Sequence, residues 1–146
     1  MTETNRSPSN VITPFDWIGG EPAVQMLVDR FYDLMDLDPS FKALRDTHGP
    51  DLSRARERLF WFLCGWLGGP SYFTENVGHP MLRARHLPFA IGVLERDQWV
   101  ACMDQAMKDT NVPEPLQNIL RPAFFETADW MRNTDLDVQS HLKEKK

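Results

Sequence analysis

Three observations predict that the chain folds as a single all-α domain. Apolar residues recur at spacings of three and four along most of its length, which is typical of amphipathic helices. Breaks that contain proline and glycine separate these runs, and no alternating strand pattern, hairpin turn or internal repeat competes with them. The 146 residues suit one hydrophobic core, so a second domain is not expected.

Both ends of the chain are predicted to lie outside this domain. Residues 1–13 are polar, rich in Ser, Asn and Thr, and contain Pro8, so we expect a flexible N-terminal arm. Residues 134–146 alternate charge and polarity and end in KEKK, so we expect a polar C-terminal extension. The domain itself is therefore predicted to span residues 14–133.

The first third of the domain contains two helical patterns. The first begins just after Pro22, and its apolar stripe consists of Val24, Leu27, Val28, Phe31 and Met35. Residues 39–45 have room for about two further turns before Thr47-His48-Gly49-Pro50 interrupts the pattern. This interruption places His48 at a corner between helices.

The middle of the domain is predicted to hold one long and one short helix. The long one ends at Gly68-Gly69-Pro70, and its stripe consists of Leu52, Ala55, Leu59, Phe62, Leu63 and Trp66. A loop is expected over residues 71–78. Pro80 can then open a short helix that runs to about His86, because Pro88 soon ends it.

Two long helices complete the prediction. One stripe, interrupted by Pro113, consists of Trp99, Cys102, Met103, Ala106 and Thr110. The final stripe consists of Leu116, Ile119, Leu120, Ala123, Phe124, Thr127 and Met131. Pro122 lies within it and predicts a local kink unless its neighbours accommodate the ring.

Composition and charge exclude several classes of protein. The 16 Lys and Arg residues against 21 Asp and Glu give a net charge of -5, which argues against binding to a nucleic-acid backbone. No apolar run approaches the ~20 residues that would span a bilayer, and the first ten residues lack the pattern of a secretory signal. We therefore expect a soluble cytoplasmic protein with no membrane insertion.

The two cysteines, Cys64 and Cys102, are too few for a disulfide framework. Both have apolar neighbours in predicted helices, so we interpret them as buried thiols. A redox pair would need Cα atoms within about 7 Å of each other, which the sequence does not determine.

Four residues that can donate or accept hydrogen bonds interrupt the apolar stripes or lie at their ends: Tyr32, His48, His86 and Trp99. A ligand site in an all-α domain lies between helices, so these residues are the candidates for it. A neutral imidazole at His86 can bind a metal while its other ring nitrogen donates to a backbone carbonyl, although the spacing alone favours a structural histidine. His79 lies two turns earlier, but Pro80 weakens a paired site.

The usual short motifs for metals and cofactors are missing from the sequence. It contains no HExxH, CxxC or EF-hand spacing, so the standard zinc and calcium templates fail. It also contains no GxGxxG or GxxxxGK[ST] motif for a nucleotide.

A combination of short motifs nevertheless resembles one family, the truncated haemoglobins of the group II class. The resemblance covers roughly residues 19–133, and the combination is far more specific than any one piece. The matching pieces are Arg30-Phe31-Tyr32, Arg58-Leu59, Gly68-Gly69-Pro70, Gly78-His79-Pro80, Leu82-Arg83 with Arg85-His86, Pro88-Phe89, and Glu95-Arg96-Asp97 followed by Trp99.

This resemblance implies a truncated globin fold, a two-over-two α-helical sandwich around haem b (iron protoporphyrin IX). His86 corresponds to the proximal ligand of the haem iron, which leaves the other side of the iron open for a gas. Tyr32 and Trp99 correspond to the distal tyrosine and tryptophan, which donate hydrogen bonds to the bound gas. His48 falls at a corner position where it would be a third polar distal group.

The resemblance also suggests further residues around the cofactor. Arg58 and Arg85 would pair with the haem propionates, although ordinary surface charge explains them too. Tyr72 and His79 are weaker propionate candidates. Leu59 and Phe62 follow the small Ala55 at helical spacing and would line the distal wall, although core packing accounts for them equally.

The function implied is the binding of oxygen, nitric oxide and carbon monoxide. Several donors around bound oxygen slow its release, which favours detoxification of reactive oxygen and nitrogen species over bulk transport. Such turnover would need a separate reductase. The alternative is a non-catalytic gas or redox sensor in which His48 or Tyr32 coordinates the iron, and a helical interaction module without cofactor is a third possibility. The chain would be a monomer or a dimer.

Overall fold

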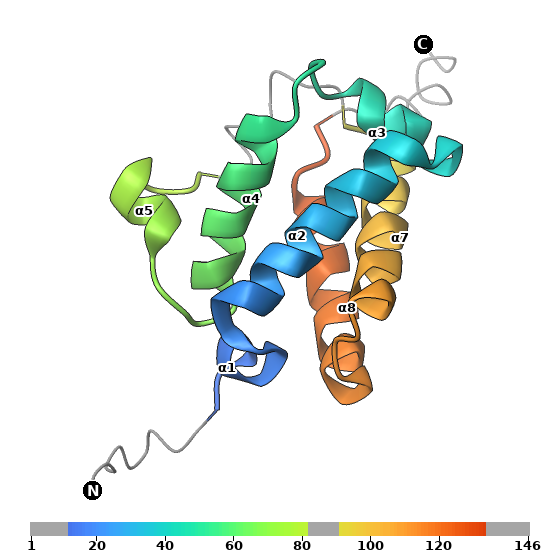
Figure 1. Cartoon of the computed structure of the whole chain (residues 1–146). Coiled ribbons are helices and arrows are strands. Elements are labelled where there is room, and N and C mark those ends of the chain that lie inside the picture. Colours follow the sequence, from blue (N-terminus) through green and yellow to red (C-terminus); the bar gives the residue numbers. More distant parts are fainter. Residues whose placement is uncertain (1–11, 82–90, 134–146) are drawn as a thin grey trace, which may run out of the picture.

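The computed structural model describes residues 12–81 and 91–133, and within these ranges every regular element is a helix, as the sequence predicts (Figure 1). The elements are α1 (Pro14–Ile18), α2 (Gly20–Leu37), the 3₁₀ turn η2 (Pro39–Phe41), α3 (Lys42–Asp46), α4 (Ser53–Trp66), α5 (Tyr72–Asn76), α7 (Val93–Asp109) and α8 (Glu114–Trp130). No described helix is long and apolar enough to cross a membrane.

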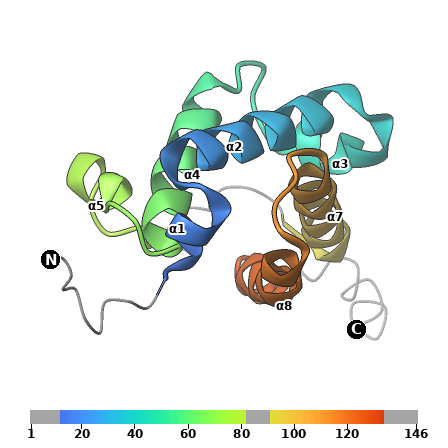
Figure 2. The same ribbon diagram turned by 60° about the horizontal axis from the view of Figure 1, so that its bottom comes forward.

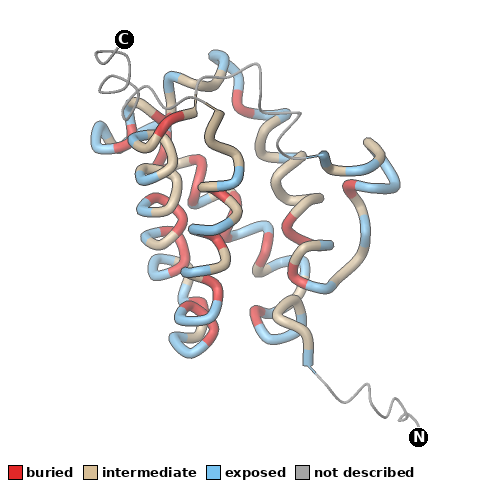
Figure 3. Tube along the Cα trace, turned by 180° about the vertical axis from the view of Figure 1, so that it is seen from behind, coloured by how far each residue is buried: buried red, intermediate tan, exposed pale blue. Residues whose placement is uncertain are grey.

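The long helices form two pairs that face each other. Helix α2 packs on α4, α7 packs on α8, and α2 also crosses α7, which joins the two pairs (Figure 2). Buried positions lie on the sides of these helices that face one another, and exposed positions lie outside (Figure 3). The side chains that are almost wholly buried come mainly from α2, α4 and α7, and include Val24, Leu27, Val28, Phe31, Met35, Leu63, Cys64, Cys102, Met103 and Met107. This is the two-over-two arrangement.

The N-terminal part of the domain differs from the prediction. Helix α1 was not predicted, and Thr13 caps it by accepting a hydrogen bond from the Asp16 N–H. Helix α2 begins at Gly20, two residues before the predicted start near Pro22. Proline is tolerated there because the first turn of a helix contains N–H groups without an intrahelical partner.

The Gly68-Gly69 pair has a specific packing role at the end of α4. Gly68 has φ +101°, a left-handed conformation that glycine adopts without strain. A Cβ atom added to Gly69 would lie 2.6 Å from the ring of Phe15. The pair therefore ends α4 and lets α1 dock on it, through a hydrogen bond from the Phe15 N–H to the Leu67 carbonyl at 2.9 Å.

Two further predictions need correction. The segment 71–78, predicted as a loop, contains α5, whose buried Phe73 packs edge-on against Phe62 at a centroid distance of 6.3 Å. Pro80 does not open a helix at once, because residues 80 and 81 are not helical. The remainder of that predicted helix lies outside the described residues, as do residues 1–11 of the predicted N-terminal arm 1–13 and the whole predicted C-terminal extension 134–146.

Helix α8 runs without interruption through Pro122. The proline lies on the exposed side of the helix, where water can satisfy the carbonyl that loses its intrahelical partner. The remaining predicted segments, including η2 and α3 over residues 39–46, agree with the structure.

Candidate functional site

Tyr32 projects from α2 into the space between the helices and is only 5% exposed. Its ring makes edge-on contacts with two others, that of Phe31 at a centroid distance of 5.0 Å and that of His48 at 6.0 Å. No described residue accepts from or donates to its hydroxyl. Burial raises the pKa of Tyr32 above its usual value, and the nearby Arg56 cation opposes this rise. The hydroxyl is therefore a neutral, buried donor.

Trp99 projects from α7 toward the same place. Its ring lies 5.2 Å from that of Phe31 and 5.5 Å from that of Phe124, measured between centroids. Within the described ranges its indole N–H also has no acceptor. Tyr32 is buried and Trp99 is half-buried, and polar groups removed from water are normally paired. Two donors that have no partner in the described part of the chain and contact the same phenylalanine therefore indicate a place where an external acceptor can bind.

His48 lies beside Tyr32, in the connection between α3 and α4. Its Nδ1 is 3.1 Å from the Leu44 carbonyl oxygen and 3.1 Å from Thr47 Oγ1, and that hydroxyl itself donates to the same carbonyl. Both contacts suit a proton on Nδ1. The corner position predicted for His48 therefore puts its ring next to the buried tyrosine.

One face of α4 forms an apolar wall beside these groups. Ala55, Leu59, Phe62 and Trp66 recur at spacings of four, three and four, and all are half-buried at the edge of the core. Trp66 stacks on Phe124 of α8, with centroids 4.8 Å apart, and Phe62 stacks on Trp66 at 6.4 Å. The wall therefore continues from α4 onto α8.

Arg58 lies at the margin of this wall, half-buried on α4. No acidic group in the described part of the chain pairs with it, whereas Arg56, Arg96 and Arg121 each pair with an aspartate. A half-buried cation beside an apolar surface suits an anionic group at the edge of a bound molecule.

The two weaker candidates are placed differently. The Tyr72 hydroxyl donates to Glu21 at the start of α2, and its ring stacks with Phe60 at 6.3 Å, so the structure does not bring it together with Tyr32 and Trp99. His79 is exposed, and its Nδ1 accepts from the Met81 N–H at 3.0 Å. His86 and Arg85 lie outside the described residues.

These surroundings fit haem. A flat apolar macrocycle needs an apolar wall, and its propionate carboxylates need cations at the edge. The gas that haem binds becomes partly negative and accepts hydrogen bonds, which matches the unpaired donors of Tyr32 and Trp99. The wall on α4, the cation of Arg58 and the two donors thus meet three separate requirements.

Neither cysteine contributes to this site. Both thiols are buried and free, as the sequence predicts, and the Sγ of Cys102 donates to the Phe31 carbonyl at 3.2 Å. Burial raises the pKa of Cys64 to about 11 and that of Cys102 to about 12. Thiols with such pKa values are mostly protonated at neutral pH, so neither is a nucleophile there.

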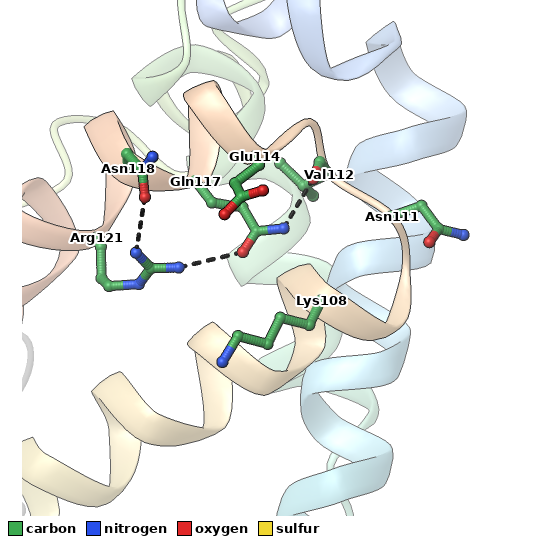
Figure 4. A pocket seen from close by; sticks show the side chains of 7 residues that line it. All are labelled: Lys108, Asn111, Val112, Glu114, Gln117, Asn118 and Arg121. Atoms are coloured by element: carbon green, nitrogen blue, oxygen red, sulfur yellow. Dashed lines mark hydrogen bonds between the residues drawn. The ribbon is translucent and has the colours of Figure 1, made fainter.

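A hollow of about 580 Å³ lies elsewhere, at the turn between α7 and α8 (Figure 4). Its lining is polar, and its two cations, Lys108 and Arg121, both pair with Asp104 at 3.2 and 2.7 Å. The buried amide of Gln117 is also satisfied, because it donates to the Val112 carbonyl and accepts from Arg121. The hollow has no apolar wall and both of its cations are already paired, so we do not assign it a ligand.

Sequence reasoning missed one charged neighbour of Tyr32 and one ring. Arg56 was not among the candidate residues, but its guanidinium lies over the Tyr32 ring. The signal that could have found it is the pair Asp29 and Asp33, one turn apart on α2. Phe124 was predicted only as a core residue, whereas it joins Trp66 to Trp99.

Comparison with known proteins agrees with this geometry. Residues 13–133 match the family described as bacterial-like globin. The chain is 38% identical over 120 residues to the group 2 truncated haemoglobin YjbI of Bacillus subtilis (strain 168), an alignment that covers 82% of this chain and 88% of that protein.

Two solved structures extend the comparison to the fold. The group II 2-on-2 haemoglobin of Agrobacterium tumefaciens superposes with a TM-score of 0.82 at 39% identity, over 86% of this chain and 97% of that one. A truncated, oxygen-avid haemoglobin of Bacillus subtilis gives a TM-score of 0.76 at 37% identity, over 83% of this chain and 99% of that one. The resemblance inferred from the motifs is thereby confirmed.

Proposed function

The chain belongs to the bacterial-like globin family and binds a diatomic gas at haem, and from this premise we propose that it holds oxygen tightly and uses it in detoxification. The proposed reactions are the conversion of nitric oxide to nitrate and peroxidase-like removal of peroxide. Bulk oxygen transport is disfavoured because a carrier must release its gas quickly.

The observation that carries this proposal is the pair of unpaired donors, Tyr32 and Trp99. Each hydrogen bond to a partly negative gas contributes about 1–3 kcal/mol to its retention. Two such bonds slow the release of oxygen and hold it in one orientation for attack by a second small molecule. The oxygen-avid relative from Bacillus subtilis supports the same reading.

The cofactor is proposed to be haem b, with His86 as the proximal ligand of its iron. Haem supplies the metal that binds the gas and exchanges electrons. Tyr32 and Trp99 would donate to the gas and orient it, and His48 would be a third polar group beside them. Leu59 and Phe62 would exclude water from the gas. Arg58 and Arg85 would hold the propionates.

Turnover requires electrons from outside the chain. The sequence contains no dinucleotide or phosphate-binding glycine motif, so we propose a separate reductase as partner. We also propose a cytoplasmic location, because reductases that use nicotinamide cofactors, and the cofactors themselves, are found there.

The test is the oxygen dissociation rate of Tyr32→Phe. Loss of one hydrogen bond to a partly charged acceptor is expected to raise the rate about 10- to 100-fold. Tyr72→Phe is the matched control, because the chain contains two tyrosines and this one donates to Glu21 instead. An unchanged rate in Tyr32→Phe would remove the tyrosine from the mechanism.

A second candidate function is a non-catalytic gas or redox sensor. It is favoured by the geometry of His48, because a proton on Nδ1 leaves Nε2 with a lone pair that can coordinate iron. The visible spectrum of the ferrous protein without gas would then be that of six-coordinate iron. In His48→Ala it would become that of five-coordinate iron. Steady-state consumption of nitric oxide or peroxide in the presence of a reductant would instead support catalysis.

A further inference from the structure

The guanidinium of Arg56 lies over the ring of Tyr32, with its Cζ 5.8 Å from the ring centroid. It reaches there from the first turn of α4, across to α2. Two aspartates one turn apart on α2 hold it: Nη2 donates to Asp33 at 2.8 Å, and Nη1 donates to Asp29 at 3.2 Å. Nη1 also lies 3.3 Å from the Asp29 carbonyl oxygen. The position of this cation is therefore fixed by both of its terminal nitrogens.

The exposure of these groups decreases from the aspartates through the arginine to the tyrosine. The carboxylates of Asp29 and Asp33 have 48% and 49% of their side-chain surface exposed, the Arg56 side chain 30%. The tyrosine ring beneath is buried. The cation is thus less exposed than its two carboxylate partners and presents its positive charge to the ring face.

Three groups confine the Tyr32 ring. Phe31 and His48 meet it edge-on, and Arg56 covers a face. The first two are held by the core and by the corner after α3, and the third by the aspartates. The direction in which the hydroxyl donates follows from the plane of the ring, because the O–H bond of a phenol prefers to lie in that plane.

We propose that Arg56 is a positioning residue for Tyr32, which fixes the ring and makes its hydroxyl a stronger hydrogen-bond donor to the bound gas. A cation over an aromatic face draws electron density from the ring, and a phenol with less ring density donates its proton more strongly. The direction of the electrostatic effect on Tyr32 agrees, since the nearby cation lowers the pKa that burial raises. The inference rests on the donor role proposed above for Tyr32.

The first experiment measures oxygen dissociation in Arg56→Gln. We expect a rate about 3- to 10-fold higher than in the parent protein. Arg56→Lys keeps the charge but not the planar fork, so it should restore part of the effect. Arg96→Gln is the matched control, because Arg96 also pairs with two aspartates and lies over a phenylalanine ring, 4.8 Å from Phe125. Equal rate changes in Arg56→Gln and Arg96→Gln would overturn the proposal.

The second experiment is a double-mutant cycle with an infrared readout. A hydrogen bond to the outer atom of bound carbon monoxide lowers the C–O stretching frequency, so Arg56→Gln should raise that frequency. In a Tyr32→Phe background the Arg56 substitution should change neither the frequency nor the oxygen rate, because its effect passes through the hydroxyl. A full Arg56 effect in that background would show that the arginine acts on the pocket by another route.

A third measurement separates failure of this inference from failure of the proposed function. In Tyr72→Phe the only remaining tyrosine is Tyr32, so ¹³C-labelled tyrosine reports on its ring alone in the diamagnetic ferrous carbon monoxide form. Arg56→Gln should shift this ring signal and speed ring rotation, even if Tyr32→Phe leaves oxygen release unchanged. An unaltered ring signal would reject the positioning role, whatever Tyr32 does for the gas.

Discussion

In each helix pair an arginine forms ion pairs with aspartates and links the two helices. Comparison of the two arginines shows what distinguishes a structural link from one that also serves a binding site. Arg56 joins α4 to Asp29 and Asp33 of α2, and Arg96 joins α7 to Asp129 of α8 while also contacting Asp97. Each guanidinium also lies over an aromatic ring.

The rings beneath the two arginines differ. Phe125 is 41% exposed and has no polar atom, so a cation over it contributes packing and little else. Tyr32 is buried and carries a hydroxyl with no partner in the described part of the chain. The same set of contacts therefore becomes part of a binding site only where the ring carries a group that can act on a ligand.

The largest effect expected from this comparison is on stability. Arg96→Gln should lower the free energy of unfolding by about 1–3 kcal/mol, because it leaves Asp129 without one of its partners. Only 16% of the Arg96 side chain is exposed, against 30% for Arg56, so Arg56→Gln should cost less. Urea unfolding followed by circular dichroism measures both. A larger loss in Arg56→Gln would mean that the α2–α4 link is the main structural one.

The next largest effect is on gas binding, and it tests the aspartates that hold the two arginines. Asp33→Asn should raise the oxygen dissociation rate about 2- to 3-fold, because Arg56 keeps its charge but loses its shorter anchor at 2.8 Å. Asp129→Asn makes the equivalent change beside Phe125 and should leave that rate unaltered. Stopped-flow mixing of the oxygenated protein with carbon monoxide gives both rates, and equal changes would remove the distinction between the clusters.

The sequence predicted those parts of the molecule that depend on periodicity over several turns. The stripes of α2, α4, α7 and α8 are long enough to show it, and Tyr32 and Trp99 were noticed because polar groups interrupt apolar patterns. Helices α1 and α5 span five residues each, too few for a period to show.

Contacts between segments far apart in the sequence could not be predicted from it, for a different reason. The stack of Trp66 on Phe124 and the reach of Arg56 across to α2 depend on how helices cross, which one helix's pattern does not contain. The same holds for Tyr72, whose hydroxyl is taken by Glu21. The role of His86 stays a prediction from the motif.

The smallest effect is on the pH dependence of stability, and it concerns Asp129, the partner of Arg96 on α8. Hydrogen bonds from Arg96 and then Arg132 lower the pKa of Asp129 below its ordinary value. A carboxyl whose pKa is lower in the folded state stabilises the fold fully above its unfolded pKa of about 3.9 and loses this contribution as the pH falls through the folded value.

Asp129→Asn should therefore flatten the loss of stability below about pH 4, measured by urea unfolding at a series of pH values. Arg96→Gln should flatten it as well, since it removes the first cause of the shift. Parallel pH curves for the parent and both variants would mean that Asp129 gains nothing from its two arginines. The contact between α7 and α8 would then depend on packing of the Arg96 guanidinium on the ring of Phe125.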